Sequence, residues 1–421
     1  MLRHTVSGVL KMRLYPFCVF LSLAAACYAA SLDWPQFGGP HGDFKSDTKG
    51  LARSWPAEGP KKLWSRPLGD GYSEVSVEGN VLYTMYRVAH DEVVLAADAN
   101  TGKTIWEYRY DATFRPGMGM ENGSGPHATP LVTENGVYAI GILANLVCLD
   151  KKTGKRIWSH DLDHEFHGTV FDRGWAPSPM AYKGWVIMKV GGEGHSFMAF
   201  DQKTGVVAWR TLQKFTNAPA SPILIHVDGQ DQLVAPMADE VVGIDPNNGF
   251  VLWTYPHSTS WGLNISTPVW GEDHLLFVSS AYNGGSCVIR LTRGGGKTTP
   301  EKVWASNRMR VHFSTAVRVG DTVYGSSGDF GPAPLTAVDV KTGKIVWQDR
   351  TFAKASFVYA DGKFIVVDED GNVALADFTP QGLKVVSRVE LLHNNAWTAP
   401  SLAGSRLYLR DRTTLMALDL R

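Results

Sequence analysis

Ten residues of the chain are of types that could hold or transform a ligand, and most lie in or near short segments of small residues. Two arginines could bind carboxylates, and two histidines are candidate acids or bases. A glutamate beside an asparagine offers the oxygen ligands that calcium prefers, and two tryptophans could stack on a flat cofactor. The candidates are Glu121, Asn122, His127, Arg173, Trp175, Trp261, Asn264, Arg310, His312 and Asn395.

The segments of small residues form a short recurring element. The copies are HATP (127–130), APSP (176–179), ASP (220–222), STP (266–268), STA (314–316) and TAP (398–400). We interpret them as the innermost strands of repeated sheets, because small residues suit a crowded centre and proline is tolerated at a sheet edge. The candidates would then gather at the mouth of a central channel. Polar loop residues line such a mouth for structural reasons as well, so no catalytic residue and no metal ligand is assigned.

A longer pattern recurs five times without gaps. In each copy an Asp precedes a Trp by eight residues, a Gly lies between them, and an apolar run comes before the Asp. This order predicts a strand, a tight turn and a second strand, with the carboxylate capping turn amides and the glycine at positive φ. The pairs are Asp98 and Trp106, Asp150 and Trp158, Asp201 and Trp209, Asp245 and Trp253, and Asp339 and Trp347.

Weaker copies near Leu291, Asp377 and Asp419 extend the series to eight units, which are separated by roughly 38 to 52 residues, as the blades of a propeller are. The last unit stops after its Asp and lacks an outer strand. Trp64 lies in an unassigned strand-like segment, 61–68. We therefore predict an all-β, eight-bladed β-propeller over 61–421 with four-stranded antiparallel blades. Its ring is closed by the strand near Trp64, which pairs with the C-terminal blade.

The Asp-x-x-Thr-Gly-Lys-x-x-Trp pattern resembles the tryptophan-docking repeat of the PQQ-like (quinoprotein alcohol dehydrogenase-like) β-propeller family, over nearly all of residues 61–421. Two branches of that family are relevant. Quinoprotein alcohol dehydrogenases bind PQQ and calcium in the funnel, whereas the propeller lipoprotein of the β-barrel-assembly machinery has no cofactor and is closer in size. The segment DWPQFGGPHGDF (33–44) is also similar to the beginning of a group of bacterial PQQ-like proteins.

Features that the resemblance to the dehydrogenases implies are missing from the sequence. Those enzymes carry adjacent cysteines against the quinone, and no Cys-Cys pair occurs here. A haem-attachment motif, C-x-x-C-H, is absent as well. Cys148 and Cys287 lie in apolar strand contexts, so we expect buried free thiols.

The N-terminus has the features of an export signal. Basic residues precede an apolar run from Leu14 to Ala26, and small residues follow before Ser31. We assign 1–30 to a signal peptide and 31–60 to an N-terminal connecting segment. Two variants stay open, cleavage near Ser31 and a lipid anchor on Cys27, whose context resembles a lipobox.

The charge is balanced, with 41 basic and 41 acidic side chains, so no global field favours nucleic acid. We expect an exported monomer in the periplasm or at the outer membrane. Two functions stay open. The first is a binding or scaffold module of the cell envelope that holds a protein partner or small ligand at its top-face loops. The alternative is a PQQ-dependent oxidoreductase with the quinone, and calcium, in the central funnel.

Overall fold

The repeat folds into the hairpins that its turn residues predict. The carboxylate of Asp98 accepts hydrogen bonds from the backbone N–H groups of Asn100 (3.0 Å) and Thr101 (2.8 Å) and from the Thr101 hydroxyl (2.9 Å). Gly102 follows with a φ of +69°, a conformation that costs glycine little. The same bonds to the carboxylate recur at Asp150, Asp201 and Asp339.

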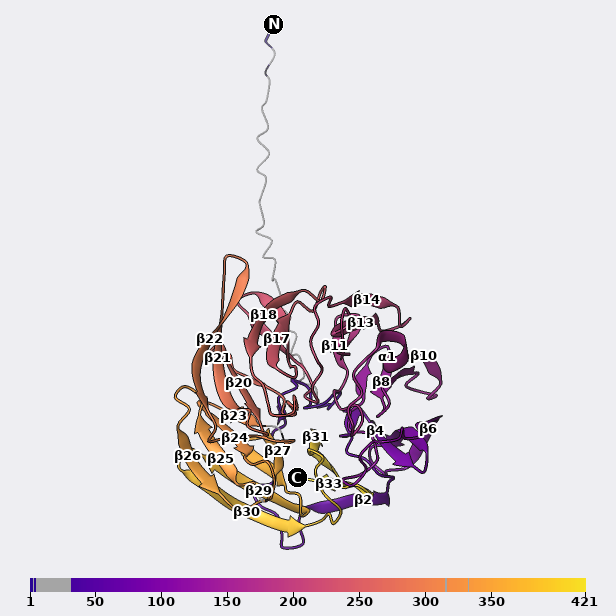
Figure 1. Ribbon diagram of the computed structural model, residues 1–421, viewed down its shortest axis with the longest axis vertical. Coiled ribbons are helices and arrows are strands. Elements are labelled where there is room, and N and C mark those ends of the chain that lie inside the picture. The colour runs from indigo at the N-terminus through magenta and orange to yellow at the C-terminus, as the bar shows by residue number, and fades with distance from the viewer. Residues whose placement is uncertain (3, 5–31, 315, 332) are drawn as a thin grey trace. The chain divides into compact units, whose positions relative to one another are not determined.

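The computed structural model describes residues 1, 2, 4, 32–314, 316–331 and 333–421. Cys18, Cys27 and the cleavage position before Ser31 lie outside these residues. The strands of the described part form eight sheets that follow one another around a common centre (Figure 1). This part of the chain is therefore an eight-bladed β-propeller, as the repeat predicts.

The first four sheets each have four strands, ordered from the innermost to the outermost. They are β3 (Ser76–Glu78), β4 (Val81–Val88), β5 (Asp91–Asp98) and β6 (Thr104–Asp111); β7 (Leu131–Thr133), β8 (Gly136–Ile140), β9 (Asn145–Leu149) and β10 (Arg156–Asp161); β11 (Met180–Tyr182), β12 (Trp185–Lys189), β13 (Phe197–Asp201) and β14 (Val207–Arg210); and β15 (Ile223–Val227), β16 (Gln230–Pro236), β17 (Glu240–Ile244) and β18 (Val251–Pro256).

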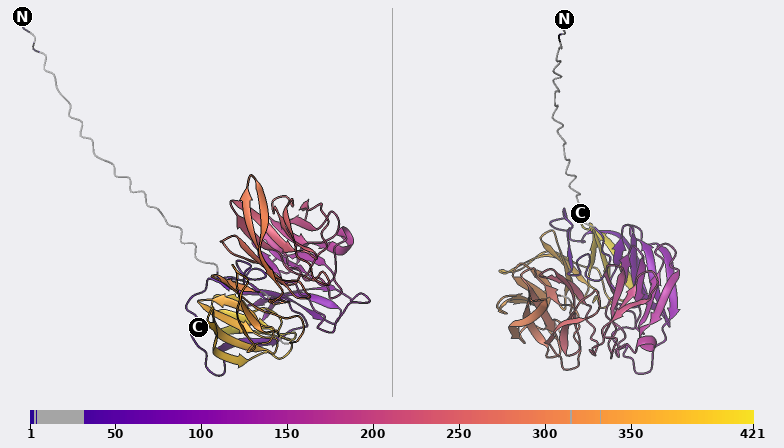
Figure 2. Two further views of the ribbon diagram at one scale, coloured as in Figure 1. Left: turned by 60° about the vertical axis from the view of Figure 1, so that its left-hand side comes forward. Right: turned by 90° about the horizontal axis from the view of Figure 1, so that it is seen from above.

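The other four sheets follow in the same order. They are β19 (Val269–Trp270), β20 (Leu275–Ser280), β21 (Gly285–Gly294) and β22 (Lys297–Ser306); β23 (Val317–Val319), β24 (Thr322–Ser326), β25 (Leu335–Asp339) and β26 (Ile345–Asp349); β1 (Lys45–Ser46), β27 (Ser356–Ala360), β28 (Lys363–Val367), β29 (Asn372–Thr379) and β30 (Gly382–Glu390); and β31 (Ser401–Ala403), β32 (Arg406–Arg410), β33 (Thr414–Asp419) and β2 (Lys61–Pro67). The hairpin of β21 and β22 extends past its neighbours (Figure 2).

The last sheet takes its outermost strand from the beginning of the propeller. Strand β2 pairs antiparallel with β33, and Trp64 lies opposite Ala417. This pairing gives the unfinished C-terminal unit the fourth strand that the repeat lacks there.

The tryptophans of the repeat join each sheet to the next one. The Trp106 Nε1–H donates to the carbonyl of Lys151 (2.9 Å), and a Cβ placed on Gly154 would lie 2.6 Å from the Trp106 ring. Glycine is therefore needed both for the turn conformation and for the close approach of the indole. The same pair of contacts occurs at Trp64 with Ala99 and Gly102, at Trp158 with Gln202 and Gly205, and at Trp304 with Val340 and Gly343.

Trp253 departs from this arrangement. Its Nε1–H donates to the side-chain Oε1 of Gln232 in its own sheet (2.7 Å). The turn before it also differs, because the residues after Asp245 are Pro-Asn-Asn-Gly instead of a Thr-Gly turn.

The segments of small residues lie just before the innermost strands, which corrects their assignment as strands. HATP ends at Pro130 and β7 begins at Leu131, because proline has no N–H for the ladder. The backbone N–H of Thr129 donates to the Ser178 hydroxyl (3.0 Å), and the Ser178 N–H donates to the Ser221 hydroxyl (3.0 Å). The segments therefore link neighbouring sheets around the channel.

The N-terminal segment packs against the propeller. The chain divides into the units Met1–Ser31 and Leu32–Arg421, and the segment 32–60 belongs to the second. Trp34 is fully buried and forms an antiparallel bridge with Val77 of β3, and β1 pairs parallel with β27. The seventh sheet consequently has five strands, one more than the four expected.

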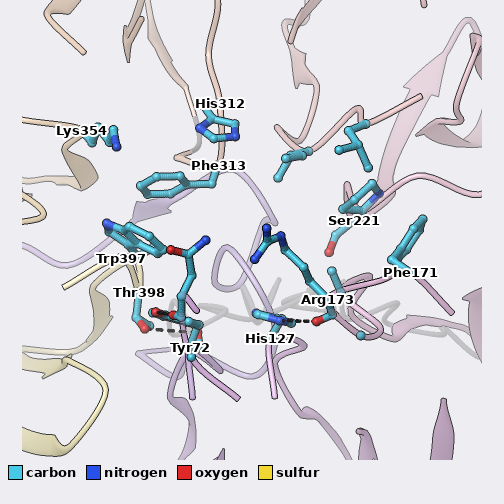
Figure 3. A pocket seen from close by; sticks show the side chains of 18 of the residues that line it. Tyr72, His127, Phe171, Arg173, Ser221, His312, Phe313, Lys354, Trp397 and Thr398 are labelled. Carbon is cyan, nitrogen blue, oxygen red and sulfur yellow. Dashed lines mark hydrogen bonds between the residues drawn. The ribbon is translucent and has the colours of Figure 1, made fainter. Parts of the chain in front are cut away.

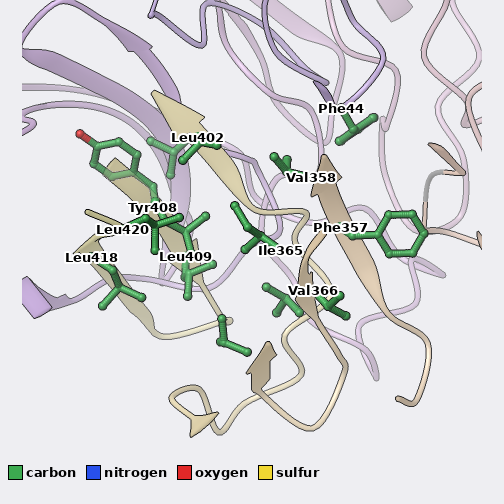
Figure 4. Close-up of a cluster of buried hydrophobic side chains, with 14 of the residues drawn as sticks. Phe44, Phe357, Val358, Ile365, Val366, Leu402, Tyr408, Leu409, Leu418 and Leu420 are labelled. Atoms are coloured by element: carbon green, nitrogen blue, oxygen red, sulfur yellow. The ribbon is translucent and has the colours of Figure 1, made fainter. Parts of the chain in front are cut away.

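Apolar side chains fill the space between adjacent sheets. Figure 4 shows one such cluster, in which side chains from β27 and β28 lie near side chains from β32 and β33. Cys148 and Cys287 are buried and not disulfide-bonded, as expected. In the part of the chain described, α1 (Leu162–Phe166) is the single helix, and no helix is long and apolar enough to span a membrane.

Candidate functional site

The segments that lead into the innermost strands gather at one end of the channel, which we call the loop face. They surround a cavity of about 920 Å³. Hydrogen bonds such as those from Thr129 to Ser178 and from Ser178 to Ser221 link neighbouring segments, and residues far apart in the sequence share the cavity wall. Figure 3 shows this wall, with Phe313 and Trp397 on one side and Arg173 and Ser221 on the other.

Aromatic rings form a continuous band along the wall. Tyr72 stacks with His127 (ring centroids 5.7 Å apart, 4° between planes) and with Trp397 (5.5 Å, 22°). Phe313 packs against Trp397 at 5.0 Å and against His312 at 5.4 Å. These rings come from the segments before four different sheets, and they continue around the mouth.

Tyr282 carries the band onward from His312. Its ring lies 4.9 Å from His312, 4.8 Å from Trp261 and 5.9 Å from Phe330. We call the eight rings Tyr72, His127, Trp261, Tyr282, His312, Phe313, Phe330 and Trp397 the aromatic band.

The cationic side chains of the wall are paired with carboxylates. Arg173 contacts Glu121 at 2.5 Å, which lowers the pKa of Glu121. Lys354 lies 3.3 Å from Glu369. Arg310, next to the wall, lies 3.2 Å from Asp329, which lines it.

Both histidines of the band are held in their neutral form. Burial, with a smaller contribution from nearby Lys354, lowers the pKa of His312 to about 4. Burial also lowers the pKa of His127, whose Nε2–H donates to the carbonyl of Arg173 (3.0 Å). The Nε2 atom of His312 is hydrogen-bonded to the Tyr282 hydroxyl (2.6 Å). At neutral pH these rings add no charge to the cavity.

The inner end of the cavity is formed by Glu74 and by Phe37 of the N-terminal segment. Glu74 is 2% exposed and accepts a hydrogen bond from the backbone N–H of Gly38 (3.3 Å). Burial raises the pKa of Glu74 to about 8. The N-terminal segment thus supplies part of the floor and covers a carboxyl that holds its proton at neutral pH.

Half of the sequence candidates line the cavity. These are Asn122, His127, Arg173, Trp261 and His312. Glu121 and Arg310 stand beside the wall as ion-pair partners. Asn395 is exposed on the segment before Trp397.

Trp175 and Asn264 lie in the interior of the protein and not in the cavity wall. Trp175 is fully buried among apolar residues, and its Nε1–H donates to the carbonyl of Pro177 (2.9 Å). Asn264 is fully buried, donates to the carbonyls of Met237 (2.6 Å) and His257 (3.1 Å), and so holds a loop in place. Residue type and segment could not separate these two from true wall residues.

Sequence reasoning missed several wall residues, namely Tyr72, Glu74, Phe313 and Trp397. Trp397 stands three residues before Pro400, just as His127 stands three residues before Pro130. That equivalence is a signal that could have identified Trp397. No comparable signal marks Glu74, which becomes a floor residue only through the N-terminal segment.

The side chains do not fit the cofactor that the repeat implies. Within the described residues, no three His, Cys, Asp or Glu side chains lie close enough together to hold a metal ion such as calcium. PQQ carries several carboxylates, and the Arg173 and Lys354 side chains that could receive them are already paired. We therefore derive no chemical step through a quinone.

Three comparisons with known proteins match this chain to the same kind of protein. A family model described as outer membrane protein assembly factor BamB matches residues 90–349. BamB of Yersinia pestis is 24% identical over 306 residues, which cover 68% of this chain and 72% of that protein. The crystal structure of BamB from Moraxella catarrhalis has a TM-score of 0.61 at 16% identity and covers 86% of this chain and 99% of that one.

A dehydrogenase structure has the same fold. Quinohemoprotein alcohol dehydrogenase from Comamonas testosteroni has a TM-score of 0.67 at 14% identity and covers 94% of this chain and 81% of that one. At such identities the structural matches establish the fold alone.

Proposed function

The chain belongs to the family of outer membrane protein assembly factor BamB, and from this premise we propose that it is a binding and scaffold module of the cell envelope. Its loop face contacts a protein partner that takes part in outer membrane protein assembly. The protein is exported and works in the periplasm or at the outer membrane as a monomer, either free or anchored through Cys27.

One observation carries the proposal of a partner surface. Three large apolar side chains stand exposed at or beside the cavity: Trp261 (63% exposed) and Phe330 (75%), which line it, and Met120 (49%), which follows the lining residue Gly119. We call these three residues the rim. Exposed apolar clusters edged by polar groups mark interaction sites, and an aromatic residue at the centre of an interface often supplies much of the binding energy.

The oxidoreductase alternative has less support. It would need a bound quinone, and the paired cations and the lack of a metal-ligand cluster among the described residues argue against one. An enzyme would raise its melting temperature on binding PQQ with calcium and would oxidise an alcohol with a dye as the acceptor. That result would replace the scaffold proposal.

The scaffold proposal is tested by the combined substitution Met120→Asp, Trp261→Asp and Phe330→Asp in the organism that encodes the chain. We expect the amount of folded outer membrane protein to fall to that of a deletion strain, because burying a carboxylate at a contact is costly. Phe250→Asp is the matched control, since Phe250 is 68% exposed and precedes the outer strand β18. Unchanged outer membrane protein in both the triple variant and the deletion strain would refute the proposal.

A further inference from the structure

The inside of the cavity differs chemically from its rim and has no assigned ligand. Figure 3 shows Phe313 and Trp397 on one side, facing Arg173 and Ser221 on the other. The two aromatic rings come from the segments that lead into β23 and β31, and the polar groups come from the segments that lead into β11 and β15. The cavity thus has an aromatic wall opposite a polar wall.

The cavity wall offers no unpaired cation, and the exposed carboxylate of Asp172, which also lines the cavity, has no ion-pair partner among the described residues. Arg173 and Lys354 are neutralised by Glu121 and Glu369. His127 and His312 are neutral, and Glu74 at the floor holds its proton because it is buried. An anion entering the cavity would lose its hydration without gaining an unpaired cation and would meet the Asp172 carboxylate, so the site favours a neutral ligand over an anion.

The polar wall offers hydrogen-bond donors that the protein does not use. Ser178 and Ser221 each accept a backbone N–H, at 3.0 Å in both cases, and neither hydroxyl donates to another group among the described residues. Both line the cavity, as Arg173 does, and Figure 3 shows Ser221 on the same side of the cavity as Arg173. A ligand hydroxyl can accept from the serines and the guanidinium and can donate to the carboxylate.

We propose that this cavity binds a neutral saccharide, with the carbon face of a sugar ring against Phe313 and Trp397 and its hydroxyl groups toward Ser178, Ser221 and the Arg173–Glu121 pair. The C–H groups of a pyranose face are slightly positive and are attracted to the negative face of an aromatic ring. The volume of about 920 Å³ lies in the range of small-ligand sites. The site lies inside the rim, so this proposal does not depend on the protein partner.

The test is a titration of the full exported protein with neutral hexasaccharides of glucose, xylose, mannose and N-acetylglucosamine, followed by calorimetry and tryptophan fluorescence. Hexagalacturonate and PQQ with calcium are the anionic comparators. We expect at least one neutral hexasaccharide to bind with a Kd below about 1 mM and to raise the melting temperature, while the anions bind more weakly.

Two variants place the ligand. Phe313→Ala removes part of the aromatic wall. Trp397→Phe is a milder change of the same wall and serves as the test if Phe313→Ala does not fold. Each should weaken saccharide binding about tenfold, a loss of about 1.4 kcal/mol. Phe250→Ala, an exposed aromatic outside the cavity, should leave the Kd unchanged.

Three results would overturn the proposal. These are no binding of any neutral hexasaccharide at about 10 mM, tighter binding of an anionic comparator, and saccharide binding that both wall variants leave unaltered. None of these results tests the scaffold proposal, because the rim variants are assessed by the amount of folded outer membrane protein and not by saccharide binding.

Discussion

Burial sets the protonation state of two side chains at the cavity, Glu74 and His312. Glu74 lies under the N-terminal segment with its Oε2 atom bonded to the Gly38 N–H, and its pKa is raised from 4.5 to about 8. The pKa of His312 is shifted in the opposite direction, from 6.5 to about 4. In both cases burial favours the neutral form, and both therefore make folding stability depend on pH.

Glu74→Gln should remove one component of that pH dependence. A carboxyl whose pKa is raised in the folded state stabilises the fold fully below pH 4.5 and progressively loses this contribution up to pH 8. Relative to the variant, the wild-type free energy of unfolding should therefore fall between pH 4.5 and 8 by on the order of a few kcal/mol. Urea unfolding across this range measures it, and parallel curves would contradict it.

His312→Gln should also change the pH dependence, but in a more acidic range and with the opposite sign. A histidine whose pKa is lowered from 6.5 to about 4 costs stability as the pH falls through that interval, because the unfolded chain takes up the proton first. The wild type should lose stability relative to the variant between pH 6.5 and 4. An NMR titration of the imidazole gives the pKa directly, and a value near 6.5 would rule this prediction out.

At the scale of elements, the turn of one sheet and the outer strand of its neighbour form one packing unit. The Trp106 indole donates to Lys151 and covers Gly154, which has a φ of +67°. A β-carbon at this glycine would lie 2.6 Å from the Trp106 ring. Glycine is therefore required at this position by the packed indole as well as by the positive φ of the turn.

Gly154→Ala should therefore destabilise the protein more than an alanine in an open turn. Gly79→Ala is the matched control, because Gly79 has a φ of +58° and a Cβ there would have nothing within 4 Å. Both variants carry the cost of positive φ, so the difference isolates the clash with the indole. We expect an additional loss of roughly 1–3 kcal/mol for Gly154→Ala by urea unfolding. Equal losses would show that the indole moves aside freely.

For the whole molecule, the ring depends on strands from opposite ends of the propeller. Strand β2 completes the sheet of β31, β32 and β33, and Pro67 lies opposite Thr414 in the register. Without that pairing, the last sheet would end in an exposed edge at β33, which would invite aggregation.

A disulfide between Pro67→Cys and Thr414→Cys should form in the monomer and hold the ring closed. A crosslink across such a long loop limits the unfolded chain and typically adds about 2–4 kcal/mol. The melting temperature of the oxidised double variant should exceed that of its reduced form. Each single-cysteine variant is a control that should not respond to reductant. Crosslinking only between different molecules would exclude the closure.

The sequence by itself determined the repeat and much of the fold. Asp, Gly and Trp at constant spacing specify a turn by local hydrogen bonds and backbone preference, so the number of units followed from the sequence. The strand at Trp64 was predicted from the unfinished last unit. The fifth strand of the seventh sheet was not predicted, because the pairing of β1 with β27 depends on where the N-terminal segment crosses the channel.

Only the tertiary structure decided which side chains form the cavity. Trp175 and Trp397 are alike in type and each precedes a proline by a few residues, yet one is buried and the other lines the wall. The direction of a loop side chain depends on contacts with neighbouring sheets, and local sequence does not encode them. Glu74 acquired its raised pKa in the same way, from a segment that lies 36 residues away at Gly38. Local spacing therefore gave the number of blades, whereas long-range packing determined the chemistry at the centre.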